Sequence, residues 1–235
     1  MLTRRYAIGS LVLAAPFIAN AALAQSTECA VFTPDRQKAV TPDEALARLK
    51  AGNERFVAGK TVNCDLLAQV KATASSQAPF ATIVGCIDSR VPPELVFDQR
   101  IGDVFSARIA GNFVNTDIIG SLEFATKVAG ARAIVVLGHS ECGAIKGAVD
   151  DVRLGNLTAM LENIKPAVAA NASYAGDKTS KNKAFVQKVA DSNVALAVET
   201  LLKRSAVLKE LVDAGQLKIV GAMHDLSTGK VTFTG

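Results

Sequence analysis

Three absences limit what this chain can be. After residue 24 the sequence has no apolar run near 20 residues long, the length needed to cross a bilayer, so the mature chain is predicted to be soluble, with no membrane partner. It also lacks a charge imbalance. The 26 basic residues face 22 acidic ones, which does not favour a nucleic-acid partner. No internal repeat or low-complexity tract occurs, which argues against a repeat protein or a disordered one.

The first 24 residues have the layout of a cleaved export signal. Arg4 and Arg5 precede an apolar run from Ile8 to Ile18, and small residues follow, ending at Ala24. The paired arginines resemble a twin-arginine signal, which predicts a periplasmic protein. An ordinary export signal with two chance arginines is the alternative. Removal of the 24 residues from the 235 would leave 211, and without Arg4 and Arg5 the formal charge is near +2.

The mature chain divides into a short arm and one domain. Residues 25–40 precede the first strong helix signal and are expected to form an N-terminal arm outside the core. That signal is Thr41-Pro42-Asp43-Glu44, in which Thr41 caps a helix and Glu44 completes a capping box. Residues 41–235 are of a length that one α/β domain can occupy.

Short apolar runs alternate with helical patterns through this domain. Continuous runs of this kind are typical of buried parallel strands, and a turn at 227–229 predicts a terminal hairpin. The predicted fold is α/β: a mostly parallel central sheet with an antiparallel edge strand, flanking helices and an N-terminal helical arm. The strand-like runs are Phe80–Cys86, Val104–Ile109, Ala133–Leu137 and Leu217–Met223.

Reactive side chains follow two of these runs. Cys86-Ile87-Asp88-Ser89-Arg90 ends one, and His139-Ser140-Glu141-Cys142 ends another. Ligands of parallel sheets bind at the carboxyl ends of the strands, where these segments are expected to meet. Two thiolates and an imidazole suit zinc, and three protein ligands leave a position for water, as in catalytic sites. A closed Cys₂His₂ site would need His224, which is expected on another strand and partly exposed.

Two cysteines remain outside this group. An exported protein enters an oxidising compartment, where an unpaired thiol is a liability. We therefore expect a disulfide between Cys29 in the arm and Cys64 after the first helix. Two free thiols are the alternative, since twin-arginine cargo folds in a reducing compartment.

These segments resemble the signature of the β-carbonic anhydrases. The resemblance covers roughly residues 41–235 and implies a zinc enzyme that converts carbon dioxide and water to bicarbonate and a proton. It also implies a four-stranded parallel sheet with an antiparallel strand, and a homodimer or tetramer. The residues that carry it are Cys86-x-Asp88-Ser89-Arg90, His139-x-x-Cys142, Val91-Pro92, Gly102-Asp103-Val104-Phe105, Ala110-Gly111-Asn112 and Gly143-Ala144-Ile145-Lys146-Gly147.

The resemblance assigns roles to individual residues. Cys86, His139 and Cys142 would hold zinc, while Arg90 keeps the Asp88 carboxylate off the metal. Asp88 would then accept a hydrogen bond from the water on the metal. Three further residues would contact substrate: Gln77 from a neighbouring subunit, and Phe105 and Ala110 as walls of an apolar pocket.

Two other functions stay open at this point. A carbonyl sulfide or carbon disulfide hydrolase could use the same site, and a non-catalytic zinc protein could keep the ligands without turnover. The absence of tryptophan bears on regulation. Ile83 stands where bicarbonate-regulated members have tryptophan, although Arg108 matches the arginine of that pocket, so regulation of that kind is not expected.

Overall fold

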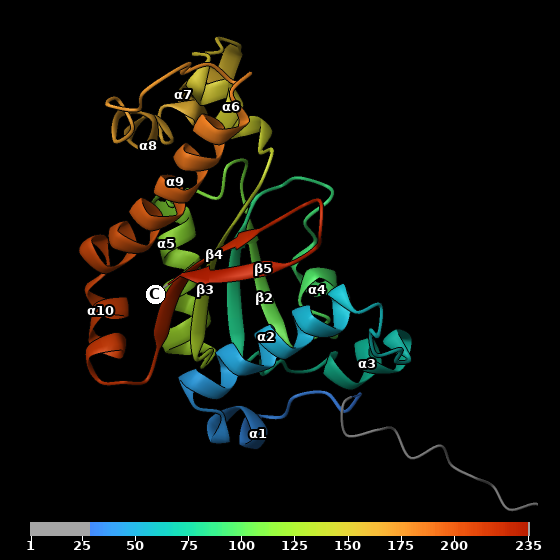
Figure 1. The fold of residues 1–235 in the computed structure, drawn as a ribbon. Helices are drawn as coiled ribbons and strands as arrows, with labels where there is room; N and C mark the ends of the chain where they lie inside the picture. The colour runs from blue at the N-terminus through green and yellow to red at the C-terminus, as the bar shows by residue number, and fades with distance from the viewer. Residues whose placement is uncertain (1–28, 235) are drawn as a thin grey trace, which may run out of the picture.

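A five-stranded sheet forms the centre of the protein in the computed structural model, which describes residues 29–234 (Figure 1). The strand order is β2-β1-β3-β4-β5, in which the first four strands are parallel and β5 is antiparallel to β4. The predicted α/β fold and terminal hairpin are confirmed. The strands are β1 (Ala81–Gly85), β2 (Val104–Arg108), β3 (Ala133–His139), β4 (Lys218–His224) and β5 (Val231–Thr234).

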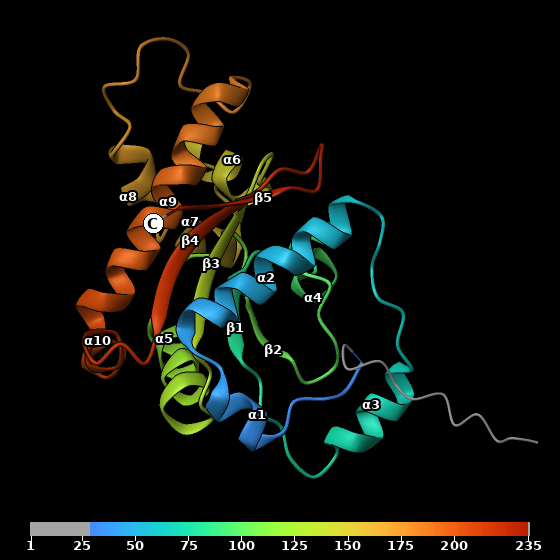
Figure 2. The same ribbon diagram turned by 60° about the horizontal axis from the view of Figure 1, so that its bottom comes forward.

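Helices precede, connect and flank the strands (Figures 1 and 2). They are α1 (Pro34–Ala39), α2 (Pro42–Val57), α3 (Leu66–Thr73), α4 (Pro93–Val96), α5 (Thr116–Glu123) continued by the π-helical turn η1 (Phe124–Val128), α6 (Gly143–Val149), α7 (Gly155–Leu161), α8 (Lys165–Ala169), α9 (Lys183–Arg204) and α10 (Ala206–Asp213).

The first long helix begins where its capping residues predict. The Thr41 hydroxyl accepts a hydrogen bond from the Glu44 backbone, and the Glu44 carboxylate accepts one from the Thr41 backbone. This reciprocal pair satisfies two helix-end donors that would otherwise be unpaired.

The segment before α2 differs from the expected arm. Its described part, from residue 29, contributes the buried side chains of Phe32 and Val40 to the core of the domain. The physical reason is local: Thr33 caps α1, and Gln37 of α1 donates hydrogen bonds to the carbonyls of Pro79 and Ala129. These contacts hold the segment against the amino ends of the strands.

Each face of the sheet has its own apolar layer. On one face, α2 and α4 cover side chains that include Ile83, Val135 and Leu137. On the other face, α5, α9 and α10 cover Val84 and Val136. Because alternate residues of each strand point to opposite faces, continuous apolar strands are what a sheet covered on both sides requires. A third apolar cluster, formed mainly by α6 to α9, surrounds the carboxyl ends of β1 and β3.

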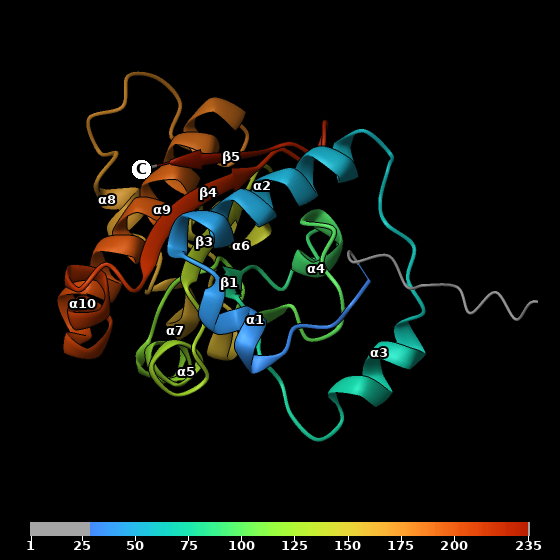
Figure 3. The same cartoon turned by 90° about the horizontal axis from the view of Figure 1, so that it is seen from below.

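The expected disulfide joins Cys29 to Cys64, with 5.5 Å between the two Cα atoms, so that prediction is confirmed. It ties the N-terminal segment to the loop before α3, a helix that lies away from the sheet (Figure 3). The predicted export signal, residues 1–24, lies outside the described residues. Within residues 29–234, no helix combines the length and the apolar character that a membrane span requires.

Candidate metal centre

Cys86, His139 and Cys142 meet at the carboxyl edge of the sheet. Cys86 follows β1 directly, His139 is the last residue of β3, and Cys142 caps the N-terminus of α6. One ligand atom from each lies within 4.8 Å of the others, and all three residues are buried. The spacing in sequence therefore becomes a compact group because the two parallel strands are neighbours with aligned ends.

The turn between His139 and Cys142 is anchored at Ser140 and Glu141. Glu141 adopts a positive φ of 57°, which reverses the chain so that Cys142 returns toward His139. The Ser140 backbone N–H donates to the His224 carbonyl at 2.9 Å, and its hydroxyl accepts from the Leu226 N–H at 3.0 Å. These bonds fix the turn to β4 and its following loop.

The His139 ring is oriented for ligation through Nε2. Its Nδ1 lies 2.9 Å from the Ser140 carbonyl oxygen, which sets Nδ1 as the donor nitrogen. Nε2 is buried and has no hydrogen-bond partner among the described residues. A buried, unpaired imidazole nitrogen is costly unless a ligand satisfies it. Two sulfurs and this nitrogen form a donor set that fits zinc.

The two thiols share one environment. The hydrogen bond from the Cys142 thiol lowers the pKa of Cys86 to about 4, with further help from His139 and the Gly111 N–H. The same bond and burial raise the pKa of Cys142. One thiolate is thus favoured without a cation, and a dication would stabilise both.

A layer of groups behind Cys86 was not recognised from the sequence. The Gly111 N–H donates to the Cys86 sulfur at 3.3 Å, and buried Asn193 of α9 donates to the Gly111 carbonyl at 2.8 Å. Gly111 has a φ of +80°, and a Cβ there would lie 2.5 Å from the Ile164 Cδ1 atom. The Ala110-Gly111-Asn112 motif marked this position, but nothing in the sequence indicated Asn193.

Asp88 and Arg90 form a two-pronged ion pair beside the metal-binding group. Arg90 Nε and Nη2 donate to the two Asp88 carboxylate oxygens at 2.9 and 2.7 Å. Asp88 Oδ2 lies 3.9 Å from His139 Nε2. The hydrogen bonds from Arg90 hold the pKa of Asp88 well below its usual range, so the carboxylate stays ionised.

Arg108 at the end of β2 holds the loop that carries this pair. Its guanidinium donates to the Cys86 carbonyl at 2.8 Å and to the Asp88 carbonyl at 2.7 Å. Ile83, the other residue considered for bicarbonate regulation, is fully buried in β1. In this chain Arg108 therefore fixes the backbone between a metal-binding residue and its charged neighbour.

The structure places the three residues expected to contact substrate in three separate parts of the domain. Ala110 adjoins Gly111 and so lies near Cys86. Phe105 of β2 packs edge-on against Phe124, with 6.4 Å between ring centroids, in a hollow outside the metal-binding group. Gln77 is exposed before β1, at the opposite end of that strand from Cys86. Within one chain the structure does not bring Phe105 or Gln77 to the metal-binding residues.

His224 corrects one expectation. It lies on another strand, β4, as expected, but it is 2% exposed rather than partly exposed, and it pairs with His139 in the register of β4 against β3. Burial lowers the pKa of His224, with a smaller effect from His139, which disfavours the charged form of the ring. It is not part of the group whose ligand atoms lie within 4.8 Å of one another. The candidate group is therefore made of Cys86, His139 and Cys142 without His224.

Comparison with known proteins matches this arrangement to one family. A family model described as carbonic anhydrase matches residues 81–231, more than half of the chain. A crystal structure of tetrameric β-carbonic anhydrases from Sordaria macrospora superposes with a TM-score of 0.63 at 30% identity, covering 70% of this chain and 85% of that one. The chain belongs to the β-carbonic anhydrase family.

Individual β-carbonic anhydrases and curated relatives support this assignment. Carbonic anhydrase 2 of Mycobacterium tuberculosis is 36% identical over 198 residues, which cover 82% of this chain and 92% of that protein. A carbonic anhydrase of Pseudomonas aeruginosa is 32% identical over 167 residues, or 68% of this chain and 76% of that protein. The Coccomyxa β-carbonic anhydrase in complex with acetazolamide has a TM-score of 0.62 at 25% identity, with 80% and 85% of the two chains covered. The chain is thus an enzyme of the carbonic anhydrase class, which hydrates carbon dioxide.

Proposed function

We propose that this enzyme catalyses the reversible hydration of carbon dioxide with one zinc ion held by Cys86, His139 and Cys142. The observation that carries the proposal is the set of two thiols and one unpaired imidazole nitrogen, all buried and within 4.8 Å of one another. Three protein ligands leave one position open in a tetrahedral site. When bound there, zinc lowers the pKa of a water molecule toward neutrality and so supplies a nucleophile.

Asp88 and Arg90 orient that nucleophile. Carbon dioxide carries no charge, so the protein has to position the attacking water rather than grip the substrate. Asp88 Oδ2 lies 3.9 Å from His139 Nε2, so this carboxylate would be available to accept a hydrogen bond from the water that the metal activates. Arg90 occupies both carboxylate oxygens and keeps Asp88 from becoming a ligand itself. In the hydration, the water oxygen would bond to carbon as one C=O π pair moves onto oxygen, and the proton released from water would leave to solvent.

Metal analysis and X-ray absorption test this assignment. The purified mature protein should contain about one zinc per chain, and the zinc edge should show two sulfur and one nitrogen ligands. Cys142→Ser, which replaces a ligand sulfur by oxygen, should lose most of the metal. Ser89→Ala, a control that removes a hydroxyl next to Asp88, should retain it. A sulfur-free zinc shell, or full zinc in Cys142→Ser, would reject the assignment.

We further propose that the active form is a homodimer or tetramer built on the β2 edge. β2 ends the sheet, Phe124 packs against Phe105 of β2 and is 51% exposed, and Val128 at the end of the same turn, η1, is 73% exposed. Gln77 lies with Ile101 and Gly102 in a shallow pocket next to the start of β2. A partner docked on this edge could bring its Gln77 toward this chain's metal centre. Analytical ultracentrifugation should show an oligomer that Val128→Asp weakens, and a stable monomer in the parent would contradict this.

Export to the periplasm through residues 1–24 is also proposed. The Cys29–Cys64 disulfide supports it, because stable disulfides persist mainly in oxidising compartments. Cell fractionation with N-terminal sequencing should find the protein in the periplasm with its first residue shortly after Ala24. Changing Arg4 and Arg5 to Lys should block export by the twin-arginine route. Unprocessed chain in the cytoplasm of parent cells would contradict the proposal.

A further inference from the structure

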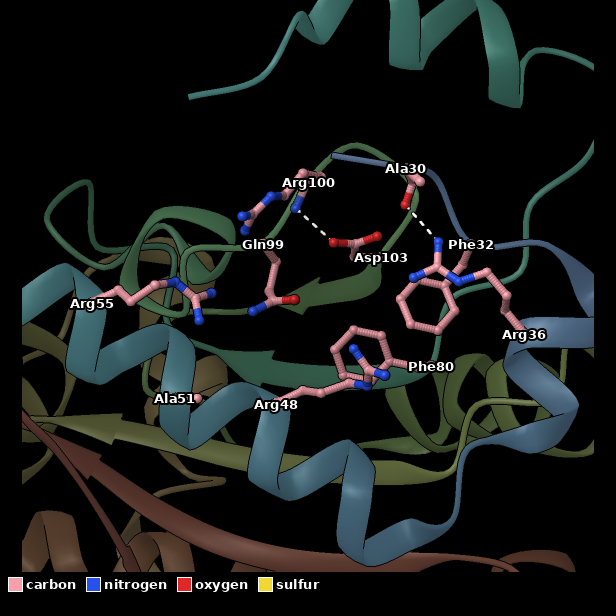
Figure 4. A pocket seen from close by; sticks show the side chains of 10 residues that line it. All are labelled: Ala30, Phe32, Arg36, Arg48, Ala51, Arg55, Phe80, Gln99, Arg100 and Asp103. Atoms are coloured by element: carbon pink, nitrogen blue, oxygen red, sulfur yellow. Dashed lines mark hydrogen bonds between the residues drawn. The ribbon is translucent and has the colours of Figure 1, made fainter. Parts of the chain in front are cut away.

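A basic pocket lies at the opposite end of the parallel strands from the metal centre. Its cavity is about 380 Å³ and lies between α1, α2 and the segments that lead into β1 and β2 (Figure 4). Phe80 directly precedes β1 and Asp103 directly precedes β2, whereas Cys86 follows β1. The pocket therefore belongs to the amino ends of the strands. Its lining residues are Ala30, Phe32, Arg36, Arg48, Ala51, Arg55, Phe80, Gln99, Arg100 and Asp103.

Two of its four arginines, Arg55 and Arg100, share one carboxylate inside the protein. Asp98 forms ion pairs with Arg55 at 2.5 Å and with Arg100 at 3.6 Å. One carboxylate offsets only one of the two positive charges, and buried Arg100 retains an Nε–H with no hydrogen-bond partner among the described residues.

The other two arginines, Arg36 and Arg48, have no carboxylate within ion-pair distance in residues 29–234. Their guanidinium carbons lie 4.5 and 5.4 Å from the centroid of the same Phe32 ring. Glu44 is one turn before Arg48 on α2, but its carboxylate is bound to Thr41 in the capping box. Arg36 Nη1 donates to the Ala30 and Val31 carbonyls at 2.7 and 2.9 Å, which leaves its other N–H groups and those of Arg48 to bind a ligand. Two cations held over one aromatic ring, with no carboxylate in ion-pair contact, favour a bound oxyanion.

Asp103 adds a selective element to this basic pocket. Its side chain is 6% exposed, and its carboxylate lies among the arginines in Figure 4. One oxygen, Oδ2, accepts the Arg100 backbone N–H at 3.0 Å, and no other hydrogen bond to the carboxylate occurs in the described part of the chain. A buried acceptor of this kind repels a fully deprotonated anion but receives a hydrogen bond from an anion that carries O–H.

We propose that this pocket binds a protonated oxyanion of the phosphate class, through Arg36 and Arg48, with the anion's O–H donated to Asp103. Phosphate carries at least one proton at neutral pH, whereas sulfate of the same size and shape carries none. The volume exceeds that of inorganic phosphate alone, so a small phosphate ester also fits. This site is separate from carbon dioxide hydration and does not rest on the zinc assignment.

Calorimetric titration of the metal-loaded protein at pH 7 and fixed salt, with inorganic phosphate and with sulfate as probes, tests the proposal. The parent should bind phosphate at one site per chain, and sulfate at least about tenfold more weakly. Arg48→Gln should weaken phosphate binding at least about tenfold. Arg204→Gln, which removes an exposed arginine at the end of α9, is the matched control and should bind like the parent. A parallel titration with glycerol phosphate distinguishes an ester from the free ion.

Asp103→Asn provides the second variant, because an amide can donate to either anion. It should lose the preference for phosphate over sulfate while Arg48→Gln loses both ligands. Absence of phosphate binding by the parent, equal affinity for the two anions, or parental binding by Arg48→Gln would each overturn the proposal.

Discussion

Arg90 grips both carboxylate oxygens of Asp88, with nitrogen–oxygen distances of 2.9 and 2.7 Å, and so fixes the carboxylate beside His139. Without the guanidinium, the Asp88 carboxylate would be free to turn toward the three candidate ligands and to bind the metal in place of water. Arg90→Ala should therefore keep its zinc but lose carbon dioxide hydration by about 100-fold or more.

Arg153→Ala is a matched control for that variant. Arg153 also pairs with an aspartate two residues earlier, Asp151, but on the surface away from the metal centre. Stopped-flow rates and zinc content should be parental in Arg153→Ala. A parental rate in Arg90→Ala would exclude the positioning role of the pair.

Asn193 is expected to act on the metal through Gly111. The Asn193 amide donates to the Gly111 carbonyl, and the Gly111 N–H donates to the Cys86 sulfur. Removing the Asn193 amide should therefore weaken the hydrogen bond from Gly111 to Cys86. Asn193→Ala should reduce zinc affinity by about 10- to 100-fold, measured by competition with a chelator. It should also lower the free energy of unfolding by about 1 to 3 kcal/mol. Exposed Asn163→Ala is the control, and unchanged zinc affinity in Asn193→Ala would refute the link.

Asp103 should make stability depend on pH. Burial is the main cause that raises its pKa to about 6 from 3.8, with Arg100, Arg36 and Arg48 acting in the opposite direction. The folded state then binds a proton that the unfolded state has released, so stability falls as pH rises from about 4 to about 6. The fall should be roughly 3 kcal/mol at most. In Asp103→Asn, the free energy of unfolding, measured in phosphate-free buffer, should not fall in this way between about pH 4 and about pH 6. The same dependence of stability on pH in parent and variant would contradict the prediction.

The disulfide joins Cys29 and Cys64, which are 35 residues apart in sequence, and should stabilise the fold by closing the loop between them. The double variant Cys29→Ser, Cys64→Ser should lose about 3 to 4 kcal/mol in denaturant unfolding. Alkylation of the unfolded, chelated parent should modify two thiols, Cys86 and Cys142. Four modified thiols would show that the disulfide does not form in the protein.

The sheet could be predicted because its strands are continuous apolar runs, and the metal-binding group because two short motifs end neighbouring strands. Local signals also gave the start of α2, since a capping box involves residues three apart.

Contacts between residues far apart in the sequence could not be predicted. The link from Asn193 to Gly111 spans 82 residues and depends on how α9 packs over the site. The burial of His224 depends on the register of β4 against β3, which no local pattern specifies. The inward packing of residues 29–40 likewise depends on the distant carbonyls that receive Gln37.

Stopped-flow measurement of carbon dioxide hydration, before and after zinc removal and restoration, tests the central claim most directly. The parent should be active and should lose activity when a chelator removes the metal. Added zinc should restore it, with no restoration in His139→Ala, because that variant lacks one of the three ligands. Full hydration activity in the zinc-free parent, or restoration in His139→Ala equal to that of the parent, would contradict the account.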